Sequence, residues 1–139
     1  MEANLPRITI DTNVIVSALV FGGNSKAIIE KLIKSEFIAY TSPQLISELL
    51  EILLQKFNFS DEMTKKVEVQ INSLFHIIYP AVEVNIARDR DDNRVLEVAE
   101  ESESSIIVTG DKDLLSLKVY KNIIIMNPKT FLTFLNLND

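Results

Sequence analysis

The chain has 139 residues, of which 47% are hydrophobic, and its formal net charge is -6. A chain of this length can bury roughly two thirds of its unfolded surface in one core, so we expect a single globular domain over residues 1–139. The absence of cysteine excludes disulfides and thiolate metal sites, and the single histidine excludes sites that need two imidazoles, so any metal must be held by oxygen ligands.

Buried strands and amphipathic helices alternate along the chain. Continuous apolar runs predict strands at residues 7–10, 37–41, 106–109 and 123–126, with a weaker strand at 76–79. Helical periodicity covers residues 25–34, 43–56, 61–75, 92–101 and 128–135. Apolar strands separated by helices are typical of a parallel sheet covered by helices. We therefore predict an α/β fold.

No segment has the length of a membrane span. The longest apolar stretch, residues 14–21, is interrupted by Ser17 and is too short to cross a bilayer, and residues 1–4 lack the basic start of a secretory signal. We therefore expect a soluble, cytoplasmic protein with no membrane contact.

Two predicted strands are each followed by a carboxylate. Asp11 comes directly after the strand at residues 7–10, and Asp111 follows the strand at residues 106–109. Carboxylates that share a pocket repel one another unless a positive group lies between them, and a divalent metal ion is the usual one. The sequence therefore predicts an acidic, metal-binding pocket.

Two further acids have positions that allow a functional or a plain structural interpretation. Asp92 lies in the first turn of the predicted helix at 92–101, so it points to the rim of the core or, together with Asp91, caps the helix. Glu48 borders the apolar face of the helix at 43–56, where it leans into a pocket or is simply solvated.

Four segments resemble, in order and spacing, a PIN domain of the VapC-like type, the toxin component of bacterial toxin-antitoxin pairs. The segments are Ile10-Asp11-Thr12-Asn13-Val14, the helix from Pro43 through Glu48, residues 91–99 and residues 108–115. The resemblance implies a three-layer α/β domain with a central parallel sheet of about five strands flanked by helices. It also implies a metal-dependent ribonuclease.

The resemblance also assigns roles to individual residues. Asp11, Glu48 and Asp92 match the three principal acids of the family, Asp111 matches the fourth, and Asn13 and Thr109 match supporting polar residues. Asp113 is an alternative to Asp111 as a metal ligand, and Asp91 is an alternative to Asp92. The expected cofactor is Mg²⁺ or Mn²⁺, because these ions prefer hard oxygen ligands and can stabilise both oxygens of a phosphodiester displacement.

The resemblance further implies an RNA substrate and protein partners. We expect cleavage within single-stranded or loop RNA, inhibition by a cognate antitoxin and a possible homodimer. The apolar face of the helix at 61–75 either contacts such a partner or packs in the core. Arg88, Arg90 and Arg94 form a local basic group that contacts phosphate or makes up a solvated face.

Aromatic residues near loops offer a further possible contact with RNA. Phe21, Phe57 and Phe59 could stack on bases, but we predict that they pack in the core.

Two rival interpretations remain. A phosphoacceptor receiver domain would need an acid pair after the first strand, but Asp11 is followed by Thr12, and the run at 37–41 ends without an aspartate. A catalytically silent PIN-like module that binds RNA or protein is the alternative that the sequence leaves open.

Overall fold

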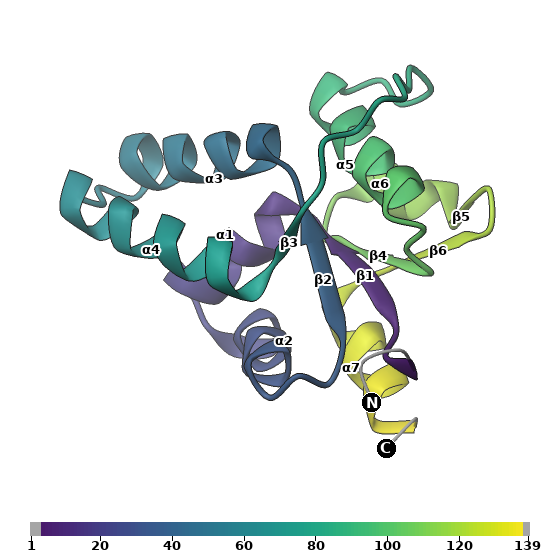
Figure 1. Cartoon of the computed structure of the whole chain (residues 1–139), viewed down its shortest axis with the longest axis horizontal. Helices are drawn as coiled ribbons and strands as arrows, with labels where there is room; N and C mark the ends of the chain where they lie inside the picture. Colours follow the sequence, from purple (N-terminus) through teal and green to yellow (C-terminus); the bar gives the residue numbers. More distant parts are fainter. Residues whose placement is uncertain (1–3, 138–139) are drawn as a thin grey trace.

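A computed structural model describes residues 4–137 (Figure 1). Its strands are β1 (Arg7–Ile10), β2 (Ile38–Thr41), β3 (His76–Ile77), β4 (Ile106–Val108), β5 (Val119–Tyr120) and β6 (Ile123–Met126). Its helices are α1 (Thr12–Val20), α2 (Gly23–Ile33), α3 (Pro43–Lys56), α4 (Asp61–Leu74), α5 (Arg90–Glu101), α6 (Lys112–Leu117) and α7 (Pro128–Leu137). The predicted α/β fold is confirmed.

The strands form one sheet in the order β3-β2-β1-β4-β6-β5. All neighbouring strands are parallel except β5, which pairs antiparallel with β6. Because β5 was not predicted, the sheet has one strand more than expected. The chain first builds outward from β1 through β2 to β3, and then returns to place β4 on the other side of β1. The strand order therefore reverses between β1 and β4. Ligands of open α/β sheets bind in the crevice at the carboxyl ends of strands at such a reversal.

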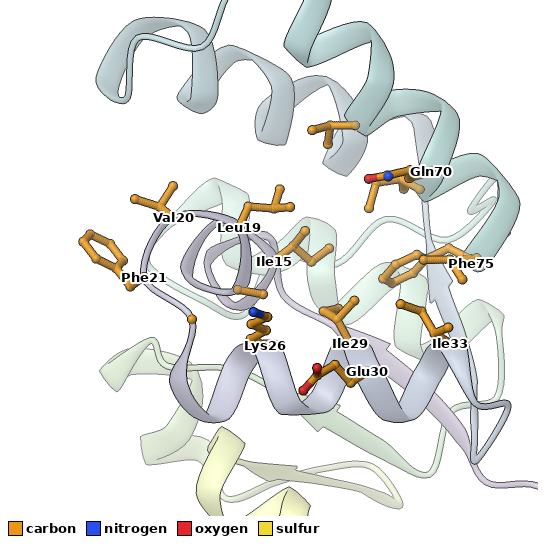
Figure 2. A pocket seen from close by; sticks show the side chains of 15 residues that line it. Ile15, Leu19, Val20, Phe21, Lys26, Ile29, Glu30, Ile33, Gln70 and Phe75 are labelled. Atoms are coloured by element: carbon orange, nitrogen blue, oxygen red, sulfur yellow. The ribbon is translucent and has the colours of Figure 1, made fainter.

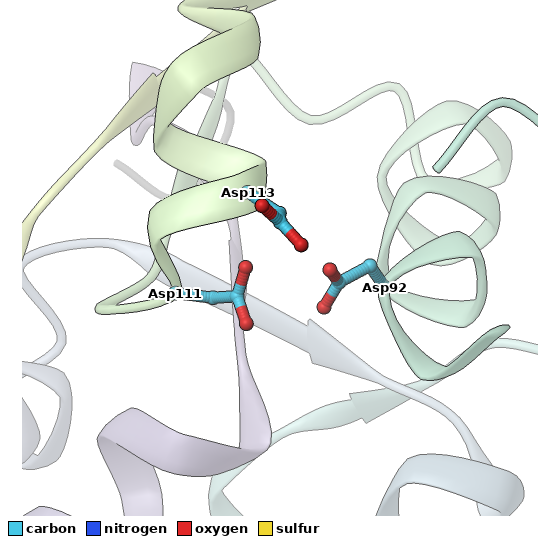
Figure 3. A group of neighbouring side chains, drawn as sticks. All are labelled: Asp92, Asp111 and Asp113. Atoms are coloured by element: carbon cyan, nitrogen blue, oxygen red, sulfur yellow. The ribbon is translucent and has the colours of Figure 1, made fainter. Parts of the chain in front are cut away.

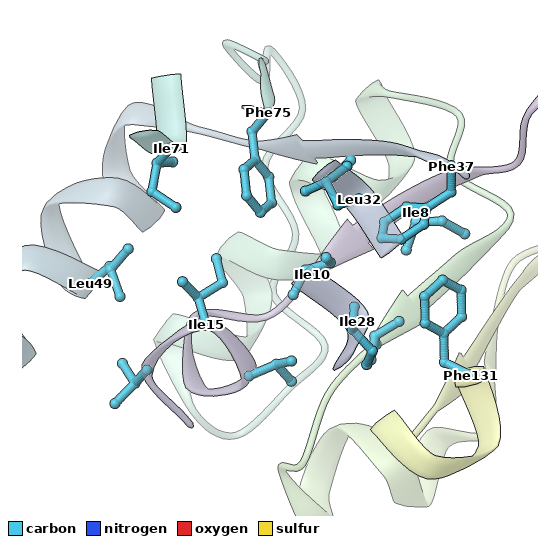
Figure 4. Packing of buried hydrophobic residues seen from close by; sticks show 14 of the residues in the cluster. Ile8, Ile10, Ile15, Ile28, Leu32, Phe37, Leu49, Ile71, Phe75 and Phe131 are labelled. Carbon is cyan, nitrogen blue, oxygen red and sulfur yellow. The ribbon is translucent and has the colours of Figure 1, made fainter. Parts of the chain in front are cut away.

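Hydrophobic side chains cover both faces of the sheet. On one face, Ile8 and Ile10 of β1 join a cluster that includes Ile28 of α2 and Phe131 of α7 (Figure 4). On the other face, Ile107 of β4 packs in a second cluster formed mainly with α5 and α6. Successive side chains of a strand point to opposite faces of the sheet, so each strand contributes to both clusters. Helices α3 and α4 extend together away from the sheet (Figure 1).

Helix α1 was not predicted, because its sequence is apolar on nearly every side. Its buried residues are Thr12, Val14, Ile15, Val16 and Ala18. A helix covered all round has no amphipathic period to read. Gly22 and Gly23, both with positive φ, then turn the chain into α2, which lies at 101° to α1. Within residues 4–137 no single helix is long and apolar enough to cross a membrane, and only the bent α1–α2 pair reaches that length and composition.

Three smaller expectations need correction. The short elements α6 and β5 were not predicted, and β3 is shorter than the predicted strand at 76–79. The prediction that Phe21 packs in the core is wrong, because its side chain is 73% exposed. Its ring packs edge-to-face with that of Phe57, at a centroid distance of 5.9 Å. Phe57 and Phe59 do lie against the core.

Candidate functional site

The carboxyl ends of β1 and β4 place Asp11 and Thr109 against each other. The backbone N–H of Asp11 donates to the Val108 carbonyl at 2.9 Å. The Thr109 hydroxyl donates to Asp11 Oδ2 at 2.7 Å and accepts from the Asp111 N–H at 3.0 Å. Because Asp11 is only 5% exposed and Thr109 is fully buried, the orientation of this carboxylate is fixed by its neighbours.

Asp111 begins α6 from the end of the next strand along the sheet. It is the N-cap of this helix, and its Oδ1 accepts the backbone N–H of Leu114 at 3.0 Å. Such a bond satisfies one of the free N–H groups at a helix start. The cap and the hydrogen bond that the Asp111 N–H donates to the Thr109 hydroxyl together hold Asp111 beside Asp11.

Helix α5 supplies Asp92 from its first turn. Asp89 is the N-cap of α5 and accepts the Asp91 N–H at 2.9 Å, so the capping role considered for Asp91 and Asp92 belongs to Asp89. Asp92 is 5% exposed, and its Oδ2 is buried without a hydrogen-bond partner within the described part of the chain. A bare buried carboxylate oxygen is costly, so it calls for a proton or a cation.

Three aspartates converge between α5 and α6. Figure 3 shows the carboxylates of Asp92, Asp111 and Asp113 directed toward one shared space, and one oxygen of each lies within 4.8 Å of the others. Asp113 also accepts a hydrogen bond from Arg88 Nη2 at 2.8 Å. Asp111 and Asp113, which were considered as alternatives, therefore both lie beside Asp92.

The remaining predicted residues line an adjoining cleft of about 390 Å³. Glu48 and Asn13 face this cleft together with Asp11, Asp92 and Asp111. The sequence interpretation gave no site role to three further lining residues, Glu51, Asp89 and Lys56. Glu51 follows Glu48 by one helical turn, and Asp89 immediately precedes α5, so spacing and capping signals were available for these two acids. The cleft thus brings acids together from the carboxyl end of β1, from α3, from the start of α5 and from the start of α6.

Crowding of these carboxylates disfavours their ionised forms. Burial, followed by the charges of Asp91 and Asp11, raises the pKa of Glu48 to about 7. Burial, followed by the charge of Asp111, raises the pKa of Asp92 to about 7. Burial also raises the pKa of Asp11, although the hydrogen bond from Thr109 opposes the rise. Each shift has the direction expected where like charges are gathered out of water.

The donor set fits a hard divalent cation. All its ligands would be carboxylate oxygens, which Mg²⁺ and Mn²⁺ prefer, and the buried Asp92 Oδ2 has no hydrogen-bond partner among residues 4–137. A cation there would offset both causes of the raised pKa values, the burial of the carboxylates and their mutual repulsion.

The basic group of residues 88–94 divides into two environments. Arg88 and Arg90 are exposed, as expected for a solvated face. Arg94 is not part of such a face, because its guanidinium is largely buried and donates to Glu97 Oε2 at 2.7 Å.

A separate apolar groove of about 620 Å³ lies between α1, α2 and α4 (Figure 2). Leu19 and Phe21 of α1 and its following turn, Ile33 of α2 and Ile71 of α4 are among its lining residues. None of the predicted acids faces this groove, so it has no part in the acidic cleft.

Comparison with known proteins gives matches in sequence and in structure. Residues 7–113 match the sequence model of the PIN domain. The uncharacterized protein MJ1680 of Methanocaldococcus jannaschii is 37% identical over 123 residues, which cover 85% of this chain and 79% of that protein.

Two crystal structures share the fold at low sequence identity. A chain of VapBC2 from Rickettsia felis, solved bound to a DNA fragment from their promoter, gives a TM-score of 0.61 at 16% identity and covers 87% of this chain and 98% of its own length. PAE2754 from Pyrobaculum aerophilum gives a TM-score of 0.64 at 19% identity, with 96% and 90% covered.

Proposed function

The chain belongs to the PIN domain family, and from this premise we propose that it is a metal-dependent endoribonuclease that cleaves single-stranded or loop RNA. The observation that carries the proposal is the convergence of the Asp92, Asp111 and Asp113 carboxylates near the point where the strand order reverses. Among residues 4–137, Asp92 Oδ2 has no hydrogen-bond partner. A purely structural role does not require unpaired buried carboxylates to lie together, whereas metal-assisted hydrolysis of a phosphodiester requires such a group to bind the metal.

The residues would divide the work as follows. Asp92 and Asp111, with Asp11 beside them, would hold Mg²⁺ or Mn²⁺, and Glu48 and Asp113 would complete the charge around it. The bound ion would supply a Lewis acid and lower the pKa of a water nucleophile. Thr109 would keep Asp11 turned toward the site through its 2.7 Å hydrogen bond. Asn13, at the mouth of the cleft, would offer a neutral polar contact to the substrate.

The choice of RNA rests on the family and on access. A scissile phosphate reaches a narrow cleft most easily when the strand is not paired in a regular duplex.

The deciding experiment measures cleavage of a mixed-sequence single-stranded RNA with Mn²⁺, with Mg²⁺ and with EDTA. We expect cleavage only with metal, and a loss of about 100-fold or more in Asp11→Asn, because loss of groups that merely support a metal ligand already costs ~10–100-fold. Glu68→Gln is a matched control, since Glu68 is an exposed acid on α4 outside the cleft. Thermal melting would establish that both variants fold.

The outcomes separate the enzyme from the alternative. An Asp11→Asn protein that cleaves as fast as the parent would disprove the proposed site. Metal binding and RNA or protein binding without any cleavage by the parent would favour a catalytically silent module.

We also propose that the protein is the toxin of a toxin-antitoxin pair, acts in the cytoplasm and has a protein partner, either a cognate antitoxin or a second copy of the chain. The apolar groove supports a partner surface, because Phe21 and Ile33 are exposed at its margin and would lose contact with water on binding. Val67 and Ile71 of α4 belong to the buried core and also line this groove, so the core-facing side of α4 would form one wall of the partner surface.

A further inference from the structure

The segment between β3 and α5, residues 78–89, is held along α5 by three side chains. Asn93, Glu97 and Glu101 are spaced four residues apart, which places them on one face of the helix. They accept the backbone N–H groups of Ala87, Val84 and Ala81, each at 2.8 Å. A segment with no regular secondary structure therefore has a fixed path.

This path delivers Arg88 to the rim of the group formed by Asp92, Asp111 and Asp113. Arg88 follows directly after the held Ala87, and its Nη2 donates to Asp113 Oδ1 at 2.8 Å. Its side chain is nevertheless 86% exposed. Because the Asp113 carboxylate is one of the three converging beside Asp92, the guanidinium lies next to the place where a phosphate would be bound.

The cleft is short of positive charge for an anionic substrate. Among residues 4–137, eleven line the cleft, of which seven are acidic and one, Lys56, is basic. RNA-binding surfaces normally meet backbone phosphates with Lys or Arg. Arg88 can supply that contact, because a guanidinium pairs with phosphate oxygens in a fork and an exposed ion pair exchanges partners readily.

We propose that Arg88 binds a backbone phosphate of the RNA at the rim of the cleft and that Asp113 is the counter-ion that holds the guanidinium there until RNA replaces it. The proposal rests on the proposed function and adds a substrate-binding residue to it. It also gives Asp113 a role that differs from metal ligation alone.

The test is a double-mutant cycle on the affinity of a fluorescent single-stranded RNA, measured in EDTA so that neither cleavage nor metal ligation contributes. Arg88→Gln should raise Kd by about tenfold, as expected for loss of one charge-assisted contact. It should also reduce the slope of log affinity against log salt by about 0.7, the value for one phosphate contact on a single strand. Asp113→Asn should lower Kd, because Arg88 no longer has a competing partner.

The cycle distinguishes release of Arg88 from simple loss of repulsion. The gain from Asp113→Asn should disappear in the Arg88→Gln background. If the gain is equally large without Arg88, Asp113 merely repels RNA and the proposal is wrong.

Arg90→Gln is the matched control. Arg90 is an exposed arginine two residues from Arg88, and it forms no ion pair with the other described residues, 4–137. Equal weakening by Arg88→Gln and Arg90→Gln would also overturn the proposal. A parent that cleaves RNA in that case leaves the proposed function intact, whereas a parent that neither binds nor cleaves RNA overturns both.

Discussion

Asp11 and Asp92 are buried to the same extent but differ in the hydrogen bonds that their carboxylates receive. Each is 5% exposed. Asp11, at the strand ends, accepts a hydrogen bond from the Thr109 hydroxyl, whereas Asp92 Oδ2, on α5, has no hydrogen-bond partner in the described part of the chain. At the strand ends, the protein itself thus supplies a hydrogen-bond donor to the buried carboxylate, whereas on α5 a bound proton or cation would have to take its place. One cleft therefore has a paired side at Asp11 and an unpaired side at Asp92.

Replacement of Asp92 by asparagine should have the largest effect and should break the asymmetry. Asp92→Asn removes the unmatched charge, so we expect the metal-free protein to melt at a higher temperature than the parent. The same change should lower cleavage by about 100-fold or more and abolish the rise in melting temperature on adding Mn²⁺. Melting curves with EDTA and with Mn²⁺ measure both effects. A variant that is less stable in EDTA would show that Asp92 is not repelled by its neighbours.

Removal of the hydroxyl at Thr109 should leave Asp11, like Asp92, with an unpaired carboxylate oxygen. Thr109→Val keeps the shape but leaves Asp11 Oδ2 and the Asp111 N–H without their partner, at a cost of ~1–3 kcal/mol in the free energy of unfolding. Loss of this support should reduce metal affinity by ~10–100-fold. Metal titration and urea unfolding check the two expectations. Thr109→Ser, which keeps the hydroxyl, should behave like the parent, and equal loss in both variants would point to packing instead.

Proton binding should sharpen the comparison through the dependence of stability on pH. The pKa of Asp92 rises from 3.8 when unfolded to about 7 when folded, so between these values the folded protein holds a proton that the unfolded chain has released. Stability in EDTA should therefore fall as pH rises from about 4 to about 7. Saturating Mn²⁺ should flatten this fall near pH 7, and Asp92→Asn should reduce it. A parent and variant with the same pH profile would contradict the assigned shift.

The sequence was sufficient for the parts of the fold that carry a strong local pattern. The strands β1, β2, β4 and β6 and the helices α3 and α4 lie where the apolar periodicity predicted them. Helix α1 was missed because burial on most sides removes that periodicity. The turns flanking β5 place Lys118 and Lys121 at positive φ without glycine, so the usual turn signal was missing there.

The sequence predicted only those parts of the candidate site in which the position of a residue in a strand or helix shows what it will lie near. Strand ends predicted that Asp11 and Asp111 meet, and the structure places them in one cleft. The bond between Thr109 and Asp11, the bare oxygen of Asp92 and the pairing of Arg88 with Asp113 depend on side-chain packing between distant segments. No local pattern encodes such contacts.

The 98-residue separation between Thr109 and Asp11 has a consequence for synthesis of the protein. The ribosome makes Asp11 well before it makes Asp92, Asp111 and the Thr109 hydroxyl that orients Asp11. A nascent chain that stops before β4 lacks Thr109 and Asp111 and therefore has no complete cleft. If the protein cleaves RNA, we expect a growing chain to acquire that activity only after residue 111 has been added.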